Sequence, residues 1–420
     1  MIKTYLMCVC AVFGLSALAG DRLFMNEDCW HFWVADSGDE ECMKRDGFSP
    51  LKPGMGATEE GLKAYIDEIA RGKVTHFLMN VNGQRANFPS KVLEPVWTSL
   101  GEPDRAHEKW VETLKRLADE GRDPYAVWIA RCREKGVSPW ISVRMNDLHR
   151  VGRADCPNVC TMWREHPEFL LKAGATWGGG FDYSQPQVRE RMLSFIREVL
   201  DRYDADGLEL DLLRFPRYLP EGREKELAPL LTDYIREIRR AVEEASAKRG
   251  RRIVLSVRVK AVPKENLDRG MDVGEWARQG LVDMVVPCNM WANIRFDIPL
   301  GEWREWTGGR VRIVPGADSG ITEEGKKRRL ATLAEYRRWA LEMRKRGAGN
   351  SFYLYNLFLH PQDGEVWNGI LSEGLLPASG AVDHYVVSPM SETPYLPGNV
   401  PADGTKGGVV RIVAAKGEYE

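Results

Sequence analysis

The sequence has no excess of either charge, with 59 lysine and arginine residues against 61 aspartate and glutamate residues in a chain of 420. A balanced chain creates no overall field toward nucleic acid or toward an anionic membrane surface. After residue 20, no apolar run approaches the ~20 residues that a membrane-spanning helix needs. The sequence therefore predicts a mature protein with no nucleic-acid partner and no membrane span.

Several motifs of well-known chemistry are also missing. No Gly-rich phosphate loop follows the first predicted strand, and no Gly-x-Ser-x-Gly sequence occurs. HxH, HExxH and paired CxxC spacings are absent, so we expect neither a metal site nor another cofactor. A metal-dependent hydrolase or deacetylase is therefore disfavoured.

The N-terminus carries the features of a signal peptide. Lys3 precedes a short apolar run, and small residues follow it, with an Ala-x-Ala type cleavage site after Ala19. Residues 1–20 are therefore expected to be removed from a secreted or periplasmic protein. In an oxidising compartment Cys156 with Cys160, and Cys29 with Cys42, are candidate disulfides, although spacing alone leaves the pairing open.

Strands and helices alternate along most of the chain, which is typical of a parallel sheet with helical crossovers. We expect helices over 58–71, 187–203 and 221–249, and others that begin near Asp272, Leu300 and Thr322. The expected strands are 22–26, 74–80, 137–143, 207–213, 252–258, 282–289, 311–315 and 351–355. Eight such units predict an α/β fold, a (β/α)8 TIM-type barrel over residues 21–360, with a doubly wound open sheet as the alternative. Residues 361–420 are richer in Pro, Gly and Ser and predict a C-terminal extension with one strand at 409–413.

The fourth predicted strand carries two carboxylates that point the same way. Glu209 and Asp211 alternate with leucines, and a period of two places the leucines under the helices and both carboxylates inside the barrel. Burying two carboxylates costs several kcal/mol unless they are paired or protonated. The strand therefore indicates either a catalytic site or a structural ion network with Arg144 and Arg258.

The stretch from Asp206 to Pro216, D-G-L-E-L-D-L-L-R-F-P, resembles the fourth strand of glycosyl-hydrolase-like families of (β/α)8 barrels. It is also similar in outline to the strand of the α-amylase clan that carries the nucleophile. The resemblance implies a glycoside hydrolase with Asp211 as its catalytic carboxylate, acting on an oligosaccharide, polysaccharide or glycoconjugate. Glu209 stands where the α-amylase clan usually has an arginine, so the two mechanisms need not be the same.

Glycoside hydrolysis needs two acid/base groups that flank the scissile bond. The sequence offers several partners for Asp211, because functional residues of a barrel gather at the carboxyl ends of its strands. We favour Asp318, across the barrel mouth, over Asp147 and His149 after the third strand and over Glu27 or Asp28 after the first. The candidate catalytic residues are Asp211, Glu209, Asp318, His149 and Asp147.

Other polar and aromatic side chains at the strand ends are candidates for substrate binding. Four arginines among them indicate an anionic glycan, such as a sialic acid, a uronate or a sulfated sugar. The alternative is that these arginines neutralise the carboxylates of the barrel. A non-catalytic glycan-binding barrel is the competing function. The candidate binding residues are Glu27, Asp28, Asn82, Arg85, Arg144, Asn146, Arg214, Arg258, Asn289, Trp291 and Tyr355.

Overall fold

The structure of the protein is a computed structural model. It describes residues 21–28, 30–102, 108–153, 155–172, 179–289, 293–322 and 328–376, together with two short strands at 385–387 and 412–414. The predicted signal peptide, Cys29 and Trp291 lie outside these residues. None of the helices in the described ranges is long and apolar enough to cross a membrane.

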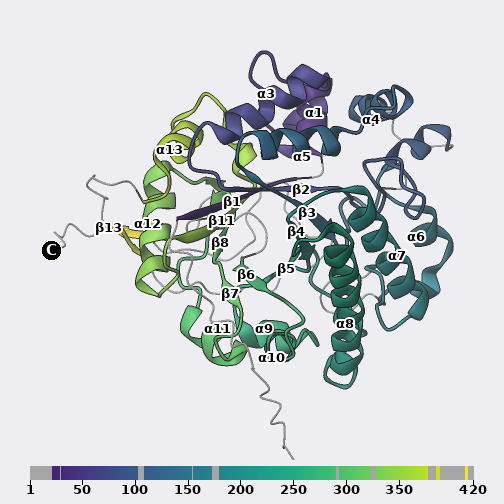
Figure 1. Cartoon of the computed structure of the whole chain (residues 1–420), viewed down its shortest axis with the longest axis vertical. Coiled ribbons are helices and arrows are strands. Elements are labelled where there is room, and N and C mark those ends of the chain that lie inside the picture. Colours follow the sequence, from purple (N-terminus) through teal and green to yellow (C-terminus); the bar gives the residue numbers. More distant parts are fainter. Residues whose placement is uncertain are drawn as a thin grey trace, which may run out of the picture.

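Parallel strands close into a barrel at the centre of the molecule, as the sequence predicts (Figure 1). Neighbours along the chain pair from β1 to β6, and β11 pairs with β1 and β8, so the ring has no open edge. The strands are β1 Arg22–Glu27, β2 His76–Asn80, β3 Ser138–Arg144, β4 Gly207–Asp211, β5 Val254–Lys260, β6 Met284–Cys288, β7 Arg312–Ile313, β8 Gly316–Ala317 and β11 Ser351–Tyr355. Because β7 and β8 are two pieces of the seventh strand, interrupted at Pro315, the barrel has eight strands.

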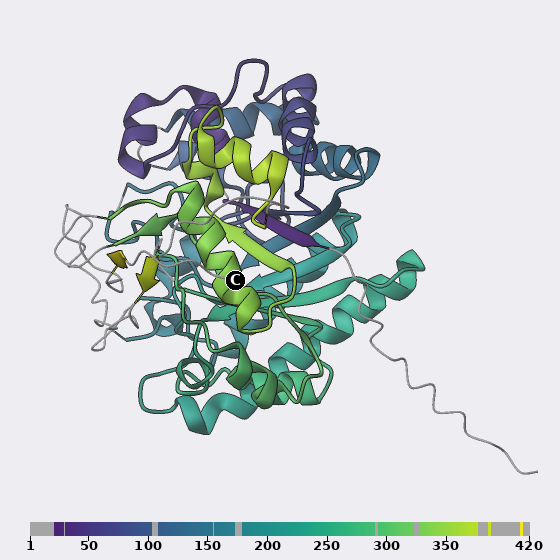
Figure 2. The same ribbon diagram turned by 90° about the vertical axis from the view of Figure 1, so that its left-hand side faces the viewer.

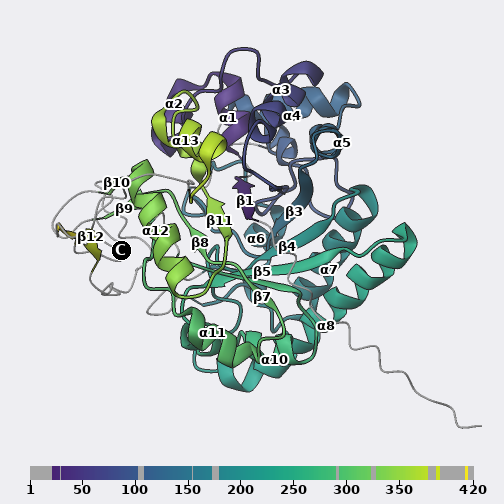
Figure 3. The same cartoon turned by 60° about the vertical axis from the view of Figure 1, so that its left-hand side comes forward.

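Helices surround the barrel on its outside, and Figure 3 shows them as a ring around the strands. Figure 2 looks onto the side that α12 and α13 cover. The helices are α1 His31–Ser37, α2 Glu40–Asp46, α3 Glu59–Ala70, α4 Lys109–Asp119, α5 Pro124–Glu134, α6 Thr161–Glu165, α7 Pro186–Arg202, α8 Glu224–Arg249, α9 Pro263–Leu267, α10 Val273–Arg278, α11 Leu300–Thr307, α12 Leu333–Lys345 and α13 Glu365–Glu373.

The helix expected near Thr322 is wrong. After β8, β9 Gly320–Ile321 ends directly before Thr322 and pairs antiparallel with β10 Arg329–Leu330, and neither Thr322 nor residues 328–332 are helical. Helix α12 begins instead after Thr332, whose hydroxyl accepts from the Glu335 amide while the Glu335 carboxylate accepts from the Thr332 amide. This reciprocal capping satisfies two amides that a helix start otherwise leaves free.

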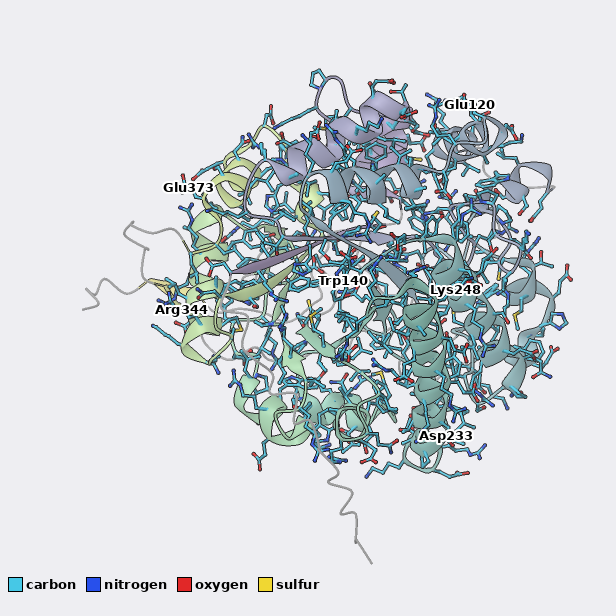
Figure 4. The ribbon with its side chains drawn as sticks, viewed as in Figure 1. Glu120, Trp140, Asp233, Lys248, Arg344 and Glu373 are labelled. Atoms are coloured by element: carbon cyan, nitrogen blue, oxygen red, sulfur yellow. The ribbon has the colours of Figure 1, made fainter. Side chains whose placement is uncertain are left out.

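Two apolar cores hold the barrel together. One lies between strands and helices and contains Leu208 and Leu210, while the other fills the barrel interior around Phe24, Trp140 and Tyr353. Figure 4 shows Trp140 near the centre of the molecule, whereas the labelled Glu120, Asp233, Arg344 and Glu373 lie toward its edge. The predicted alternation of β4, leucines outward and carboxylates inward, is therefore what the structure shows.

The chain continues its packing beyond residue 360, where we expected the barrel to end. Helix α13 lies against α12, and the Lys73 amide before β2 donates to the Leu371 carbonyl at 2.7 Å. Further on, β12 Tyr385–Val387 pairs with β13 Ile412–Ala414 in an antiparallel ladder.

The candidate disulfide between Cys156 and Cys160 is not formed, and both residues are buried thiols. The sulfur atoms face different partners. Cys156 Sγ lies 3.9 Å from the His149 carbonyl oxygen, and Cys160 Sγ lies 3.7 Å from a guanidinium nitrogen of Arg191. Burial raises the pKa of the Cys156 thiol, which disfavours the reactive thiolate.

Candidate active site

A cavity of about 410 Å³ lies at the carboxyl end of the barrel strands, where β1, β3, β4 and β11 lead into their loops. Its lining combines charged groups with aromatic faces. The lining residues are Asp28, Trp30, Arg45, Asp46, Phe48, His149, Arg150, Arg153, Arg214, Asn356 and Leu359. Four arginines and two aspartates stand in this set, and Arg45 and Arg150 also pair with Glu108 while Arg153 pairs with Asp155.

Asp28 is the carboxylate that reaches this cavity from the end of β1. Its Oδ2 accepts from Arg144 at 2.6 Å and lies 3.4 Å from the Tyr355 hydroxyl, which donates to it. Burial alone would raise the pKa of Asp28, but the charges of Arg144 and Arg214, joined by His149 when it is protonated, outweigh it and hold that pKa well below its ordinary value. Asp28 is therefore ionised across the whole physiological range.

His149 stands beside Asp28 and is oriented by Asp147. His149 Nδ1 lies 3.0 Å from Asp147 Oδ1, and Nε2 lies 2.8 Å from a guanidinium nitrogen of Arg214. Because a guanidinium only donates, Nε2 accepts and Nδ1 carries the proton that it donates to Asp147. Burial lowers the pKa of His149, and the nearby Arg214 and Arg144 act in the same direction against Asp147, so the ring is neutral at pH 7.

Asp147 and Asp28 share one counter-ion. Arg144 donates through one nitrogen to Asp147 at 2.9 Å and through the other to Asp28. Burial would raise the pKa of Asp147, but His149 and Arg144 lower it well below its ordinary value. Arg144 is itself fully buried, and it lies 5.9 Å from the centre of the Trp30 ring.

Asp211 is the register partner of Arg144 and lies in the same layer of the barrel, but it does not border the cavity. Its side chain is 1% exposed, and it holds Arg258 through two hydrogen bonds, of 3.1 Å from Nε and 2.8 Å from a terminal nitrogen. Its Oδ1 also accepts from the Leu213 and Arg214 amides. Asp211 therefore fixes both Arg258 and the start of the loop that carries Arg214.

Glu209 lies one layer deeper, inside the barrel. Its Oε1 accepts from Asn26 at 3.1 Å, from Ser142 at 2.8 Å and from Tyr353 at 3.0 Å, and its Oε2 is buried without a partner. Burial raises the pKa of Glu209 to about 7, with Asp211 acting in the same direction against Arg258. Glu209 thus connects three strands beneath the barrel mouth through hydrogen bonds and does not line the cavity.

The structure directs several other predicted residues away from this cavity. Glu27 accepts from Tyr65 and lies 2.6 Å from His31, on the helix side of β1. Arg85, also fully buried, pairs with Glu94 and Glu102.

Five further predicted residues serve the loops around the mouth or lie outside the described residues. Asn82 donates to the Arg144 carbonyl, Asn146 donates to the carbonyls of Phe181 and Arg217, and Asn289 donates to the Asn293 carbonyl. Asp318 accepts from Asn356 at 2.9 Å, which borders the cavity. Trp291 is not among the described residues.

Sequence reasoning missed the aromatic wall of the cavity. Trp30 lies 5.2 Å from the Arg150 guanidinium and stands edge-on to His149 at 5.3 Å, and Phe48 comes from the loop after α2. Trp30 follows the polar end of β1 by two residues, so its position relative to the strand end was a usable signal. Phe48 offered none, because nothing in its local sequence places that loop over the mouth.

In the ranges that the structure describes, no group of three or more His, Cys, Asp and Glu side chains is arranged to hold a metal ion. The charged cluster at the mouth is instead a network of carboxylates neutralised by arginines. At the cavity wall Asp28 supplies an anion, His149 supplies a neutral imidazole, and Trp30 and Phe48 supply aromatic faces on which a sugar ring can stack.

No protein-family model matches the chain, and no curated protein matches it in sequence. Among solved structures, it is similar to the PgaB (BpsB) glycoside hydrolase domain from Bordetella bronchiseptica, at 12% identity over 86% of this chain and 99% of that domain, with a TM-score of 0.50. It is also similar to α-L-fucosidase isoenzyme 2 from Paenibacillus thiaminolyticus, at 14% identity over 80% of this chain and 45% of that one, with a TM-score of 0.47. The chain thus spans less than half the length of the fucosidase. The likeness shows the fold, a TIM-type barrel that this chain shares with the PgaB domain.

Proposed function

We propose that this protein is a glycoside hydrolase that cleaves an anionic glycan in the cavity at the barrel mouth. The observation that carries the proposal is the pairing of an ionised carboxylate, Asp28, with a carboxylate-oriented imidazole, His149, on one cavity wall. The glycoside-hydrolase-like fold supports it, because barrel enzymes place their chemistry at this end. Export, indicated by residues 1–20, is part of the same proposal.

Asp28 and His149 are suited to the two roles that hydrolysis requires. Asp28, kept ionised, stabilises or attacks the anomeric carbon as the glycosidic bond breaks. His149, once protonated, donates a proton from Nε2 to the leaving oxygen and then takes one back from the attacking water. Two titratable neighbours whose environments push their charge states apart are typical of acid/base sites.

Arg214 links this chemistry to an anionic substrate. While His149 is neutral, Arg214 donates to Nε2. When His149 is protonated both groups are donors, so Arg214 is released and can bind a carboxylate or sulfate of the sugar. Asp211, which the strand resemblance implied as the catalytic carboxylate, then acts as a positioning residue through Arg258 and the Arg214 amide.

Reducing-sugar release from sialylated, uronate-containing, sulfated and neutral glycans tests the proposal. We expect release from an anionic glycan, with kcat reduced about 100-fold or more in Asp28→Asn and His149→Gln. Asp201→Asn is the matched control, since Asp201 is 65% exposed and pairs only with Lys248 at the surface. If Asp211→Asn folds and loses hydrolysis while Asp28→Asn keeps it, Asp211 is the catalytic carboxylate. Glycan binding without release by the wild type would make the protein a binding barrel.

A further inference from the structure

The opposite end of the barrel carries an unusual group of basic side chains. Arg22 precedes Phe24 by two residues on β1, and Arg312 on β7 is the register partner of Met284 on β6. Phe24 and Met284 both belong to the core inside the barrel. Because side chains alternate along a strand and register partners share a face, Arg22 and Arg312 point into the amino-terminal end of the barrel.

Neither guanidinium has an ion pair or a hydrogen bond to any other described residue, although both side chains are half-buried. The acidic groups at this end are already engaged. Asp206 accepts from Arg133 and Arg251, and Asp283 accepts from Arg239 and Arg252. Half-buried arginines without counter-ions are rare, because desolvating an unpaired charge is costly.

The pKa values of the basic groups at this end show that positive charge is unfavourable there. Burial lowers the pKa of Arg312, and the positive charge of Arg22, which enters the same end of the barrel, lowers it further. His76, stacked on Phe24 at 4.1 Å, has its pKa lowered to about 3 by burial and by both arginines. Ser351, the register partner of Arg22, adds a hydroxyl on the same inner face.

We propose that Arg22 and Arg312 bind a small tetrahedral oxyanion, phosphate or sulfate, at the amino-terminal end of the barrel. Two guanidinium forks and a hydroxyl from three separate strands present donors from several sides, which suits a tetrahedral set of oxygens. Both arginine side chains are only half-buried, which gives an anion access from solvent. This site lies across the barrel from the mouth and does not depend on the proposed hydrolase activity.

Thermal unfolding of the full chain in 0–20 mM sodium sulfate or phosphate, at constant ionic strength set by sodium chloride, tests the site. We expect the wild-type Tm to rise by about 2 °C, because a ligand that binds only the folded state stabilises it. Arg22→Gln and Arg312→Gln should each lose more than half of this shift. Arg240→Gln, at an exposed and unpaired position of α8, should keep it.

Behaviour without the oxyanion separates binding from ordinary structure. In chloride alone, Arg22→Gln and Arg312→Gln should be at least as stable as the wild type, because each removes one of two repelling charges. Isothermal titration calorimetry of the wild type with phosphate should give one site. Equal Tm shifts in all four proteins, or no shift and no heat in the wild type, would overturn the proposal.

Discussion

The guanidinium of Arg258 lies 3.8 Å from the centre of the Tyr355 ring, so the cation rests on the ring face inside the barrel. The same guanidinium is held in its plane by Asp211. The Tyr355 hydroxyl accepts from Arg144 at 3.0 Å, which connects this stack to Asp28. The most buried layer of the mouth is thus one continuous network from β4 to β1.

Breaking this network at Arg258 should be costly. In Arg258→Met the carboxylate of Asp211 stays buried without its counter-ion, so we expect a loss of about 3–5 kcal/mol in the free energy of unfolding, measured by urea denaturation. Arg240→Met, on the exposed face of α8, should change it by less than about 0.5 kcal/mol. Adding Asp211→Asn to Arg258→Met should restore part of the loss. A single-variant loss below about 1 kcal/mol would show that Asp211 is not dependent on Arg258.

The barrel could be predicted from the sequence because the strands carry local patterns of apolar residues. Alternating apolar residues in β4 and apolar runs in β5 and β6 predicted eight strands at the observed places. The sequence analysis did not predict the break in the seventh strand, although Pro315 lies between its two pieces. The capping box at Thr332 and Glu335 is a sequence signal for the start of α12, ten residues after the start that we expected.

The site was only partly predictable from the sequence. Neighbouring polar residues at a strand end look equivalent in the sequence, but the alternation of side chains sends them to opposite faces of the strand. Asn26 points into the barrel, and Asp28 shares its parity, whereas Glu27 points to the helices and contacts His31 and Tyr65. Parity alone thus separates Asp28 from Glu27. Which carboxylate borders the cavity depends on which carboxylates the buried Arg144 and Arg258 pair with. These pairs join residues far apart in the chain, so they leave no local sequence pattern.

Glu209 should make stability depend on pH near neutrality. Its pKa in the folded protein is about 7, above the ordinary value of 4.5, so the folded state binds the proton more tightly than the unfolded state. Its contribution is fully present below pH 4.5 and is lost as the pH rises through about 7. Relative to Glu209→Gln, which cannot ionise, the wild type should lose roughly 3 kcal/mol between pH 4.5 and 8, measured by urea denaturation. A pH-independent difference would mean that Glu209 does not titrate.

The ion pairs of Arg144 should make the protein less stable in acid, which is the opposite of the pH dependence expected from Glu209. The pKa values of Asp28 and Asp147 are lowered in the folded protein, so their contribution to stability is present above pH 4 and is lost as the pH falls through their folded pKa values. Arg144→Gln should cost about 3–5 kcal/mol at pH 7 and less at pH 3, where the variant can protonate the carboxylates that Arg144 no longer holds ionised. Arg131→Gln, which breaks a partly exposed pair with Asp67, should cost under about 1 kcal/mol at both values. An equal loss for Arg144→Gln at pH 7 and pH 3 would argue against this ion network.

The proposed hydrolysis should increase in mildly acidic solution. His149 must be protonated to act, and burial keeps its pKa below the ordinary value, whereas Asp28 is ionised throughout this range. We expect kcat to fall as the pH rises through the pKa of His149. In Asp147→Asn the negative charge that favours protonation is gone, so the falling limb should move to lower pH. A limb at the same pH in Asp147→Asn would separate His149 from the proton transfer.

Gly207 should be intolerant of any side chain, because an added Cβ would overlap Cδ2 and Cε2 of the Trp140 indole, which covers it on the neighbouring strand. Gly207→Ala must therefore displace a ring that fills the barrel interior, at a cost of about 1–3 kcal/mol or more in the free energy of unfolding. Gly301→Ala in α11, where nothing lies within 4 Å, should be neutral or slightly stabilising by the same urea assay. Because the clash is with one ring, Trp140→Leu combined with Gly207→Ala should cost less than the sum of the two single changes. Strict additivity would show that the strain at Gly207 comes from the backbone and not from Trp140.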